Sequence, residues 1–260
     1  TYADDSGELV AADTNEDCES MARKAIDLIT EWYDCVGLQI NPIKSEIVSF
    51  GFEAQEMNIC GEIVQPSKST KFLGCSIQND LRWNTQVETV ASKLRQAAGR
   101  IRNCGRLLSN YQRKQLYHAW AGGVLHSNAL AYLPHLTISQ IRTLQTSANS
   151  AVRAVVGAPH VGPVPMTDIR QSLNIESVTQ IRDRCLAFYA WSAAPRWDFT
   201  GRDTRGRRAG KIPLPDLRGW SGSITENMAK VMWNKLPENL KTINEKEIAK
   251  NAIKSWTTGL

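Results

Sequence analysis

The sequence predicts an α+β protein in which residues 1–80 mix helix and strand and the remainder is mostly helical. Three observations favour this class. Short alternating apolar runs surround one strongly periodic segment within residues 1–80. From residue 84 onward, apolar residues recur at the 3.6-residue spacing of helices, and capping residues precede them. No stretch approaches the ~20 consecutive apolar residues of a membrane span, so no membrane is expected among the partners.

The first expected element is a β-hairpin that carries Asp4 and Asp5 at its tip. Asp, Ser and Gly are common in tight turns, and the apolar run Leu9–Ala12 predicts a short buried strand that returns from this turn. The other strand would lie mostly before residue 1. Together with the missing initiator Met, this indicates a piece of a longer chain.

A helix is predicted next. Thr14 or Asn15 caps its start, acidic residues in its first turn suit the helix dipole, and Gly37 ends it. Residues at helical spacing define a face that we expect to be buried: Cys18, Met21, Ala22, Ala25, Ile29, Trp32, Tyr33 and Val36.

Three strands are expected after this helix. One covers Ile47–Phe50, and two more lie around Met57–Val64 and Lys71–Gln78. The hairpin, the helix and these strands would form one mixed unit over residues 1–80.

Long helices follow this mixed unit. Asn84 caps the first of them, and its buried face is expected to comprise Val87, Val90, Ala91, Leu94, Ala98 and Ile101. A second helix is predicted from Ser109 toward Tyr132. A third begins with the capping-box pattern of residues 137–140 and ends at Gly157.

The last hundred or so residues are divided by Pro- and Gly-rich stretches. Residues 159–165 predict a linker, and residues 196–220 predict an Arg-rich loop. Short helices are expected over residues 166–173, 177–193, 225–236 and 245–256. The expected domains are therefore residues 1–80, 81–158, 159–220 and 221–260.

Charge is divided unevenly along the chain. Residues 1–62 carry 14 acidic and 3 basic residues, a net charge of −11, whereas residues 63–260 carry 12 acidic and 28 basic residues, a net charge of +16. This asymmetry suggests a polyanionic partner for the basic part, although a solvated surface would have the same composition.

Cysteine and histidine give no sign of a metal site. The six cysteines form no C-x-x-C pair, which favours buried thiols in a reducing compartment, the nucleus or the cytoplasm. The four histidines lack metal-ligand spacing and are interpreted as structural.

The adjacent carboxylates of Asp4 and Asp5 allow two interpretations. They are either solvated turn residues or ligands of a cation. Carboxylate oxygens suit Mg²⁺, which prefers carboxylates together with substrate phosphates. Two such ions ~3.5–4 Å apart would stabilise the attacking and leaving oxygens of a phosphoryl transfer, and a third carboxylate is expected from elsewhere.

Three motifs in order favour the metal interpretation. Residues 2–5, Y-A-D-D, resemble the Y-x-D-D signature of reverse transcriptases. After the predicted helix, residues 37–46 (GLQINPIKSE) are similar to the family's G-L-x-x-N-x-x-K-T-E segment, with Ser45 in place of Thr. Residues 72–74, F-L-G, are similar to the hairpin that grips the primer.

The rest of the chain resembles the C-terminal half of polymerases from LINE-like, jockey-like retrotransposons, which lack long terminal repeats. Residues 144–153 (LQTSANSAVR) are similar to their L-Q-x-x-Q-N-x-A-x-R helix, with Ala148 in place of Gln. Residues 233–237 (WNKLP) are similar to their W-N-x-L-P motif and argue against a group II intron maturase. The resemblance implies the C-terminal part of a polymerase palm, a helical thumb and a helical C-terminal region.

The resemblance also implies roles for the aspartates. Asp4 would bind the two catalytic Mg²⁺ ions, and Asp5 would support the site or contact the primer end. Tyr2 would pack near the primer or template, or would simply be an aromatic residue on a strand. The fingers and the first catalytic aspartate of the family would precede residue 1.

Lys44 would approach the departing pyrophosphate, where it could donate a proton or stabilise negative charge. A surface lysine paired with Glu46 is the alternative. Phe72, Leu73 and Gly74 would form the primer grip. They could also belong to a buried core strand, and the two interpretations are compatible.

Basic residues on the helix that starts at Asn84 would follow the phosphates of a duplex. They are Lys93, Arg95, Arg100, Arg102 and Arg106. A solvated helix face is the alternative, but Glu88 is the single acidic residue nearby, which favours a phosphate partner. The Arg-rich residues 202–211 would contact RNA or keep a loop soluble.

The implied activity is that of an RNA-directed DNA polymerase fragment, a nucleotidyltransferase that uses an RNA template, a DNA primer and deoxynucleoside triphosphates. This fragment alone is expected to be inactive, because the upstream aspartate and fingers would be missing. The alternative is a retroelement relic that binds nucleic acid without catalysis.

Overall fold

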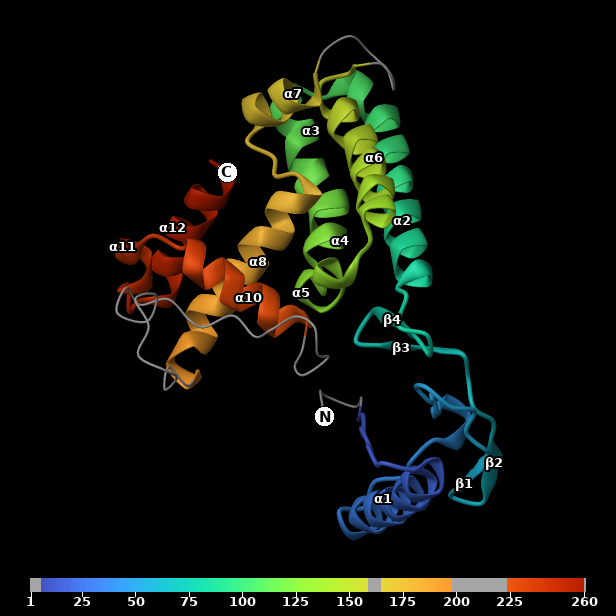
Figure 1. Cartoon of the computed structure of the whole chain (residues 1–260). Helices are drawn as coiled ribbons and strands as arrows, with labels where there is room; N and C mark the ends of the chain where they lie inside the picture. Colours follow the sequence, from blue (N-terminus) through green and yellow to red (C-terminus); the bar gives the residue numbers. More distant parts are fainter. Residues whose placement is uncertain (1–5, 159–164, 198–223, 260) are drawn as a thin grey trace. The chain divides into compact units, whose positions relative to one another are not determined.

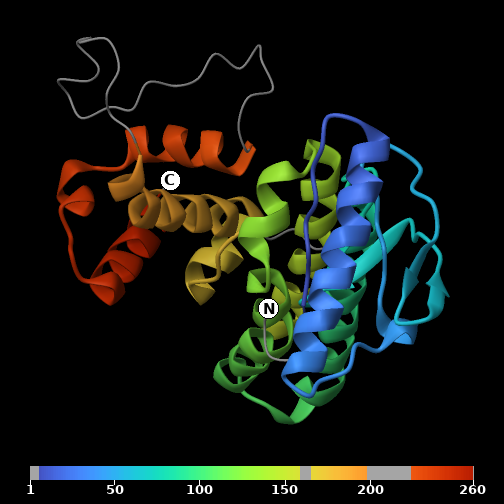
Figure 2. The same ribbon diagram turned by 90° about the horizontal axis from the view of Figure 1, so that it is seen from below.

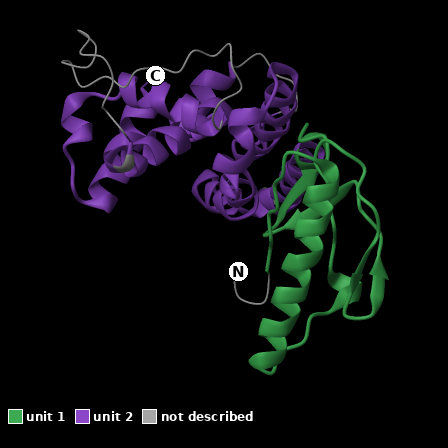
Figure 3. Cartoon of the chain, turned by 60° about the horizontal axis from the view of Figure 1, so that its bottom comes forward, with its two compact units in different colours: residues 1–86 green, residues 87–260 purple. Residues whose placement is uncertain are grey.

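The computed structural model describes residues 6–158, 165–197 and 224–259 (Figure 1). Over these residues the fold is mixed α and β and mostly helical, with two small antiparallel sheets. The chain divides into two compact units, residues 1–86 and 87–260, which Figure 3 colours separately. Tyr2, Asp4, Asp5, the linker residues 159–164 and the Arg-rich residues 202–211 lie outside the described residues.

The first helix of unit 1 is α1 (Asn15–Cys35), and the predicted start and end of this helix are confirmed. The Thr14 hydroxyl oxygen accepts a hydrogen bond from the Asp17 backbone N–H at 3.1 Å, which satisfies a donor of the first turn. Gly37 follows the helix with φ of 72°, a left-handed conformation that glycine adopts without steric cost.

The segment before α1 is not the buried strand that the apolar run predicts. Residues 6–13 have no strand structure and run alongside α1 (Figure 2). Leu9 is 83% exposed, and a contact of 3.8 Å between the Cys18 Sγ and the Val10 carbonyl oxygen joins this segment to the helix. The segment therefore packs through its backbone and not through Leu9.

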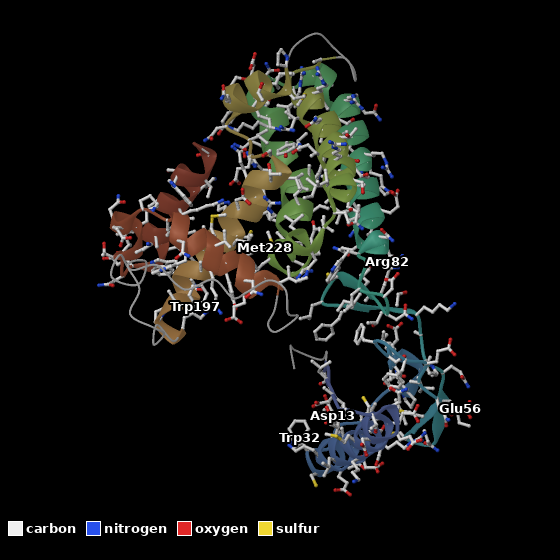
Figure 4. All side chains as sticks on the ribbon, viewed as in Figure 1. Asp13, Trp32, Glu56, Arg82, Trp197 and Met228 are labelled. Atoms are coloured by element: carbon white, nitrogen blue, oxygen red, sulfur yellow. The ribbon has the colours of Figure 1, made fainter. Side chains whose placement is uncertain are left out.

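The expected burial of the α1 face is also wrong in part. No residue of α1 is buried. Cys18, Ala22, Ala25, Ile29 and Tyr33 are partly covered. Met21, Trp32 (57% exposed, labelled in Figure 4) and Val36, which follows the helix, face outward.

Two hairpins replace the two strands expected around residues 57–64 and 71–78. β1 (Met57–Ile59) pairs with β2 (Glu62–Val64), and β3 (Ser69–Phe72) pairs with β4 (Cys75–Gln78), both antiparallel. In each turn both central residues have positive φ, at 50° and 89° for Cys60-Gly61 and at 47° and 80° for Leu73-Gly74. Such two-residue turns suit the right-handed twist of the flanking strands.

The strand expected over residues 47–50 is absent. Ile47 forms one isolated parallel bridge with Pro66 and no ladder. Among residues 6–86, the buried residues are Met57, Ile59, Cys75 and Gln86. The described part of this unit therefore has a small core.

Two glutamine side chains join β4 to the first turn of α2 (Asn84–Cys104). The Ser76 backbone N–H donates to Gln86 Oε1 at 2.9 Å, and the Thr85 backbone N–H donates to Gln78 Oε1 at 2.9 Å. Further along α2, the predicted face of Val87, Val90, Ala91, Leu94, Ala98 and Ile101 is buried, as expected.

The continuous helix predicted from Ser109 toward Tyr132 is interrupted. Ser109 does form a capping box with Gln112 at the start of α3 (Asn110–Tyr117). The chain then passes through a π-helical turn, η3 (His118–Gly122), into α4 (Gly123–His126). Asn128, with φ of 54°, breaks the helix before α5 (Ala129–Tyr132) and the 3₁₀ turn η4 (Leu133–His135).

The next helices follow the prediction closely. Capping boxes at Thr137 and Ser177 start α6 (Ile138–Val155) and α8 (Val178–Ala193), with α7 (Met166–Leu173) between them. α10 (Ile224–Lys235) and α12 (Lys246–Thr258) match the last two predicted helices, and the short α11 (Glu238–Lys241) was not expected.

The centre of this region is α8. It contacts α5 and α6 as well as α10 and α12, as Figure 1 shows. Its alanine-rich face packs against Met232, Trp233 and Ile253, while Trp197 and Met228 (Figure 4) lie at the edge of the same cluster. None of the described helices combines the length and the apolarity that a membrane span requires. All six cysteines lie within the described residues and are free.

Candidate nucleic-acid interface

Residues next to the aspartate pair contact two other parts of unit 1. The Ser6 hydroxyl is hydrogen-bonded to the Tyr33 hydroxyl on α1. A Cβ on Gly7 would lie 3.2 Å from Cε2 and Cζ of Phe72, tighter than an ordinary van der Waals contact, so the Phe72 ring packs directly on the Gly7 backbone. Residues 6–7, the helix and the F-L-G hairpin therefore meet, although they are far apart in sequence.

Lys44 ends the 3₁₀ turn η1 (Pro42–Lys44), which Asn41 caps by accepting a hydrogen bond from the Ile43 N–H at 3.1 Å. The Lys44 side chain is exposed and forms no ion pair with any described residue, so the alternative of a pair with Glu46 is not observed. Glu46 instead accepts a hydrogen bond from the Thr70 hydroxyl on β3. This contact joins the segment that contains Lys44 to the F-L-G hairpin.

The F-L-G residues occupy the turn of the second hairpin. Phe72 and Leu73 are 37% and 42% exposed, so the alternative of a buried core strand is wrong for them. Leu73 and Gly74 are the two turn residues with positive φ. The geometry therefore presents an apolar hairpin tip at the surface of unit 1.

The basic residues of α2 divide into two groups. Arg95 forms an ion pair with Glu88. Arg102 Nη2 donates to the Ser150 carbonyl oxygen at 3.2 Å and to its hydroxyl at 3.0 Å. Lys93 and Arg100 are exposed and form no ion pair with other described residues, which leaves their charges available to a partner.

A groove lies beside these arginines, between α2 and α6, which run side by side in Figure 1. We call it the α2/α6 groove. Its volume is about 380 Å³, and its lining comprises Arg95 of α2 and Arg142, Thr143, Thr146, Ser147 and Ser150 of α6. Sequence reasoning missed the α6 residues. Their hydroxyl groups recur every three or four positions, and that spacing would have indicated a polar helix face.

The α6 residues similar to the retrotransposon motif have structural roles. Gln145 Nε2 donates to Asn149 Oδ1 at 2.9 Å, and Gln145 Oε1 accepts from the Val178 backbone N–H at 3.0 Å, at the start of α8. Asn149 also accepts a hydrogen bond from Arg170 of α7. Arg153, the last residue of the motif, is buried. This part of the motif therefore stabilises the fold.

Two of the described histidines, His126 and His135, contact side chains that are distant in sequence. His126 Nδ1 lies 2.9 Å from Arg184 Nη2. Burial, together with the nearby Arg184, lowers the pKa of His126, and burial lowers the pKa of His135. Among the described residues no group of three or more His, Cys, Asp or Glu side chains could hold a metal ion. A complete ligand set would therefore need residues outside this part of the chain.

Burial perturbs two further groups in unit 2. It raises the pKa of Tyr117 to about 12 and raises the pKa of the Cys185 thiol. Neither group lies in the α2/α6 groove.

Comparison of the chain with protein-family models, with curated proteins and with solved structures finds no match in any of the three.

Proposed function

We propose that this chain is the C-terminal palm segment and helical thumb of an RNA-directed DNA polymerase from a LINE-like, jockey-like retrotransposon. The whole enzyme would extend a DNA primer on an RNA template with deoxynucleoside triphosphates. The observation that supports this most strongly is the meeting of motif segments within unit 1. Gly7, which follows Asp4 and Asp5 in sequence, packs on Phe72, and Glu46 binds Thr70.

Asp4 and Asp5 are the residues of this chain that would hold Mg²⁺, completed by a carboxylate from an upstream segment. Their donor set fits, because carboxylate oxygens are the ligands that Mg²⁺ prefers beside substrate phosphates. The bound ions would stabilise the attacking primer hydroxyl and the leaving pyrophosphate.

Lys44 is proposed to act on the leaving group. It is exposed at the end of a 3₁₀ turn, and a lysine side chain is a compact ammonium donor on a flexible stem. It can therefore stabilise the pyrophosphate charge or donate a proton as that charge develops. The F-L-G hairpin tip, with its exposed Phe72 and Leu73, is proposed to position the primer strand.

The test is primer extension by an enzyme that contains this chain together with the upstream polymerase half. Asp4→Asn keeps the side-chain shape and removes the charge. It should reduce the rate of extension to below about a hundredth of wild type while the fold survives. A surviving rate above that level would contradict metal ligation by Asp4.

A second candidate function is nucleic-acid binding without catalysis. The observation that favours it is the basic face of α2, where Lys93 and Arg100 are exposed and form no ion pair with described residues. This face can hold phosphates without the aspartates. A filter-binding assay, carried out together with the extension assay, discriminates the two functions. If the enzyme that contains this chain and the upstream polymerase half binds nucleic acid but does not extend a primer, the second function is supported.

A further inference from the structure

We propose that Tyr33 of α1 is a positioning residue for the aspartate pair. Its hydroxyl holds Ser6, the residue after Asp5, in a fixed place beside the F-L-G hairpin. This inference rests on the proposed function, because it takes Asp4 and Asp5 as the metal ligands. It adds to that function a residue of α1, which none of the sequence motifs includes.

The Tyr33 side chain reaches back to the part of the chain that directly follows the aspartates. Its hydroxyl is hydrogen-bonded to the Ser6 hydroxyl, 27 residues earlier in the sequence. Tyr33 is half-buried, whereas Ser6 is exposed. Because consecutive Cα atoms are about 3.8 Å apart, a fixed Ser6 limits where Asp5 can lie.

A second contact acts on the next residue, Gly7. A Cβ placed on Gly7 would lie 3.2 Å from two ring atoms of Phe72, at the end of β3, so the ring packs directly on the Gly7 backbone. The two contacts come from different elements, one from α1 and one from the hairpin. Two neighbouring residues that are both held restrict the direction of the chain as well as its position.

Tyr33 is itself held by its neighbours. Its ring meets the Trp32 ring in an edge-to-face arrangement, with centroids 5.2 Å apart and an interplanar angle of 80°. Its carbonyl oxygen accepts a hydrogen bond from the Leu38 N–H at 2.9 Å, which is the Schellman pattern of a helix end. A side chain that is already ordered loses little conformational entropy when it binds Ser6.

These contacts complete a closed path through unit 1. The segment that starts after α1 carries Lys44 and is joined to β3 by the bond between Glu46 and Thr70. β3 leads into the F-L-G hairpin, which packs on Gly7, and the bond made by Ser6 returns the path to α1. Loss of that bond opens the path beside the aspartates in sequence, and a displacement of about 1 Å among reacting groups can slow a reaction by up to ~100-fold.

The bond is better suited to positioning than to stability. Ser6 is exposed, and water can replace either hydroxyl once the bond is broken. Its loss should therefore leave the melting temperature almost unchanged. The rate of a reaction that depends on the alignment of its groups is the more sensitive measure.

The first experiment tests the contacts in the 260-residue protein by NMR. A nuclear Overhauser effect between the Gly7 Hα protons and the Phe72 ring protons should be present in the wild type, and its absence there would overturn the inference. Tyr33→Phe keeps the ring, removes the hydroxyl and should weaken this effect, because Gly7 can then move away from the hairpin. Tyr111→Phe, at an exposed tyrosine of α3, is the matched control and should leave the effect unchanged.

The second experiment measures primer extension by the enzyme that joins this chain to the upstream polymerase half. Tyr33→Phe should lower kcat about three- to tenfold, the range for loss of one hydrogen bond, and leave KM for the primer–template duplex unchanged. Binding of Mn²⁺, which accepts the same carboxylate ligands as Mg²⁺ and is followed by electron paramagnetic resonance, should weaken by a similar factor. The melting temperature should change by less than about 2 °C.

A double-mutant cycle shows whether Tyr33 acts through Ser6. Ser6→Ala should lower kcat as much as Tyr33→Phe does, and the double variant should be no slower than either single variant, because both changes remove the same bond. Ser6→Thr keeps a hydroxyl and should retain the wild-type kcat. Losses that multiply in the double variant would overturn the proposed pairing.

Gly7→Ala tests the second contact. A Cβ at 3.2 Å from the Phe72 ring forces the chain or the ring to shift by a few tenths of an ångström, so kcat should fall. Gly123→Ala is the control, since Gly123 is helical, exposed and without neighbours within 4 Å of a Cβ. A wild-type kcat in Gly7→Ala would show that the contact with Phe72 does not position this segment.

The outcomes separate this inference from the proposed function. If the wild-type enzyme extends a primer, Asp4→Asn does not, and Tyr33→Phe matches the wild type, the positioning role is wrong and the proposed function stands. If Asp4→Asn extends as well, the metal role of Asp4 fails and this inference fails with it. If Tyr33→Phe lowers kcat and the melting temperature together, Tyr33 is a structural residue and the positioning role is overturned. No extension by the wild-type enzyme would contradict both.

Discussion

Gln145 and Asn149 connect three helices through three hydrogen bonds. Gln145 joins α6 to the start of α8, and Asn149 accepts from both Gln145 and Arg170 of α7. Burial lowers the pKa of Arg170, and its Nε has no hydrogen-bond partner among the described residues, so the bond to Asn149 is its main compensation. A partly buried guanidinium group that loses its acceptor keeps the full cost of desolvation.

Asn149→Leu should therefore destabilise the protein by about 1–3 kcal/mol, because it leaves the Arg170 guanidinium without its acceptor. Urea unfolding measures this difference. Asn251→Leu on α12 is the control, since Asn251 is exposed and its replacement should change stability by less than about 0.5 kcal/mol. Equal effects of the two variants would contradict a structural role for the α6 motif.

His126 makes stability depend on pH. Burial, then Arg184, Lys254 and His118, lower its pKa from the ordinary value of about 6.5, while Glu176 raises it. The unfolded chain therefore binds a proton at a higher pH than the folded chain does. The stability contribution is fully present above about pH 6.5 and is lost as the pH falls toward the folded pKa.

His126→Gln should make stability less dependent on pH between about pH 7 and pH 5, by at most ~1.4 kcal/mol per pH unit. Thermal unfolding at a series of pH values measures this slope. The other described histidines titrate in the same direction, so a residual slope is expected. A slope identical to wild type would mean that His126 is protonated alike in both states.

At the scale of the element, the F-L-G hairpin depends on its turn. Leu73 and Gly74 both have positive φ, and a side chain at such a position strains the backbone. Gly74→Ala should therefore destabilise the hairpin by about 1–2 kcal/mol. Hydrogen exchange of the amides of residues 69–78 measures this locally, with exchange accelerated in the variant.

Gly123→Ala again provides the control, because Gly123 has helical φ and open space around its Cβ. Replacement of Leu73 by Asn, which tolerates the left-handed region, should restore part of the protection in the Gly74→Ala variant. Unchanged exchange in Gly74→Ala would show that the turn does not limit the hairpin.

The bounds of helix α1 can be predicted from its own sequence, but the burial of its side chains cannot. Its cap at Thr14 and the glycine after it follow from local chemistry. Its apolar residues nevertheless divide between a partly covered face and an outward face that includes Met21 and Trp32. Periodicity identifies an apolar face, but only the elements that pack on it decide whether it is buried.

At the scale of the whole molecule, the two units differ in burial and in charge. The described part of unit 1 buries Met57, Ile59, Cys75 and Gln86, whereas unit 2 contains most of the fully buried side chains, including Leu144, Ile181 and Leu186. The acidic residues concentrate in residues 1–62 and the basic residues in residues 63–260. Local stability should follow this difference in burial.

Amides of α1 should therefore exchange with solvent at least about tenfold faster than amides of α6 and α8, which corresponds to roughly 1.4 kcal/mol or more in opening free energy. Hydrogen–deuterium exchange with mass spectrometry measures both helices in one sample. The terminal residues of each helix should be left out of the comparison, because helix ends fray. Equal protection of α1 and α8 would contradict the inference that unit 1 is the less stable unit.

The sequence by itself determined the features that depend on local chemistry. The caps at Thr14, Ser109, Thr137 and Ser177, the buried face of α2 and most helix boundaries follow from side chains within a few residues of one another. The order of motifs that suggests a polymerase also follows from the sequence alone. The catalytic roles of Asp4, Asp5 and Lys44 stay predictions.

Only the tertiary structure decided which residues meet. It packed Gly7 on Phe72, turned the expected strands into hairpins at Gly61 and Gly74, and brought Arg142 and Arg95 into the lining of one groove. The physical reason is that burial and contact depend on elements distant in sequence. Neither hydrophobic periodicity nor residue type shows which of these distant elements come into contact.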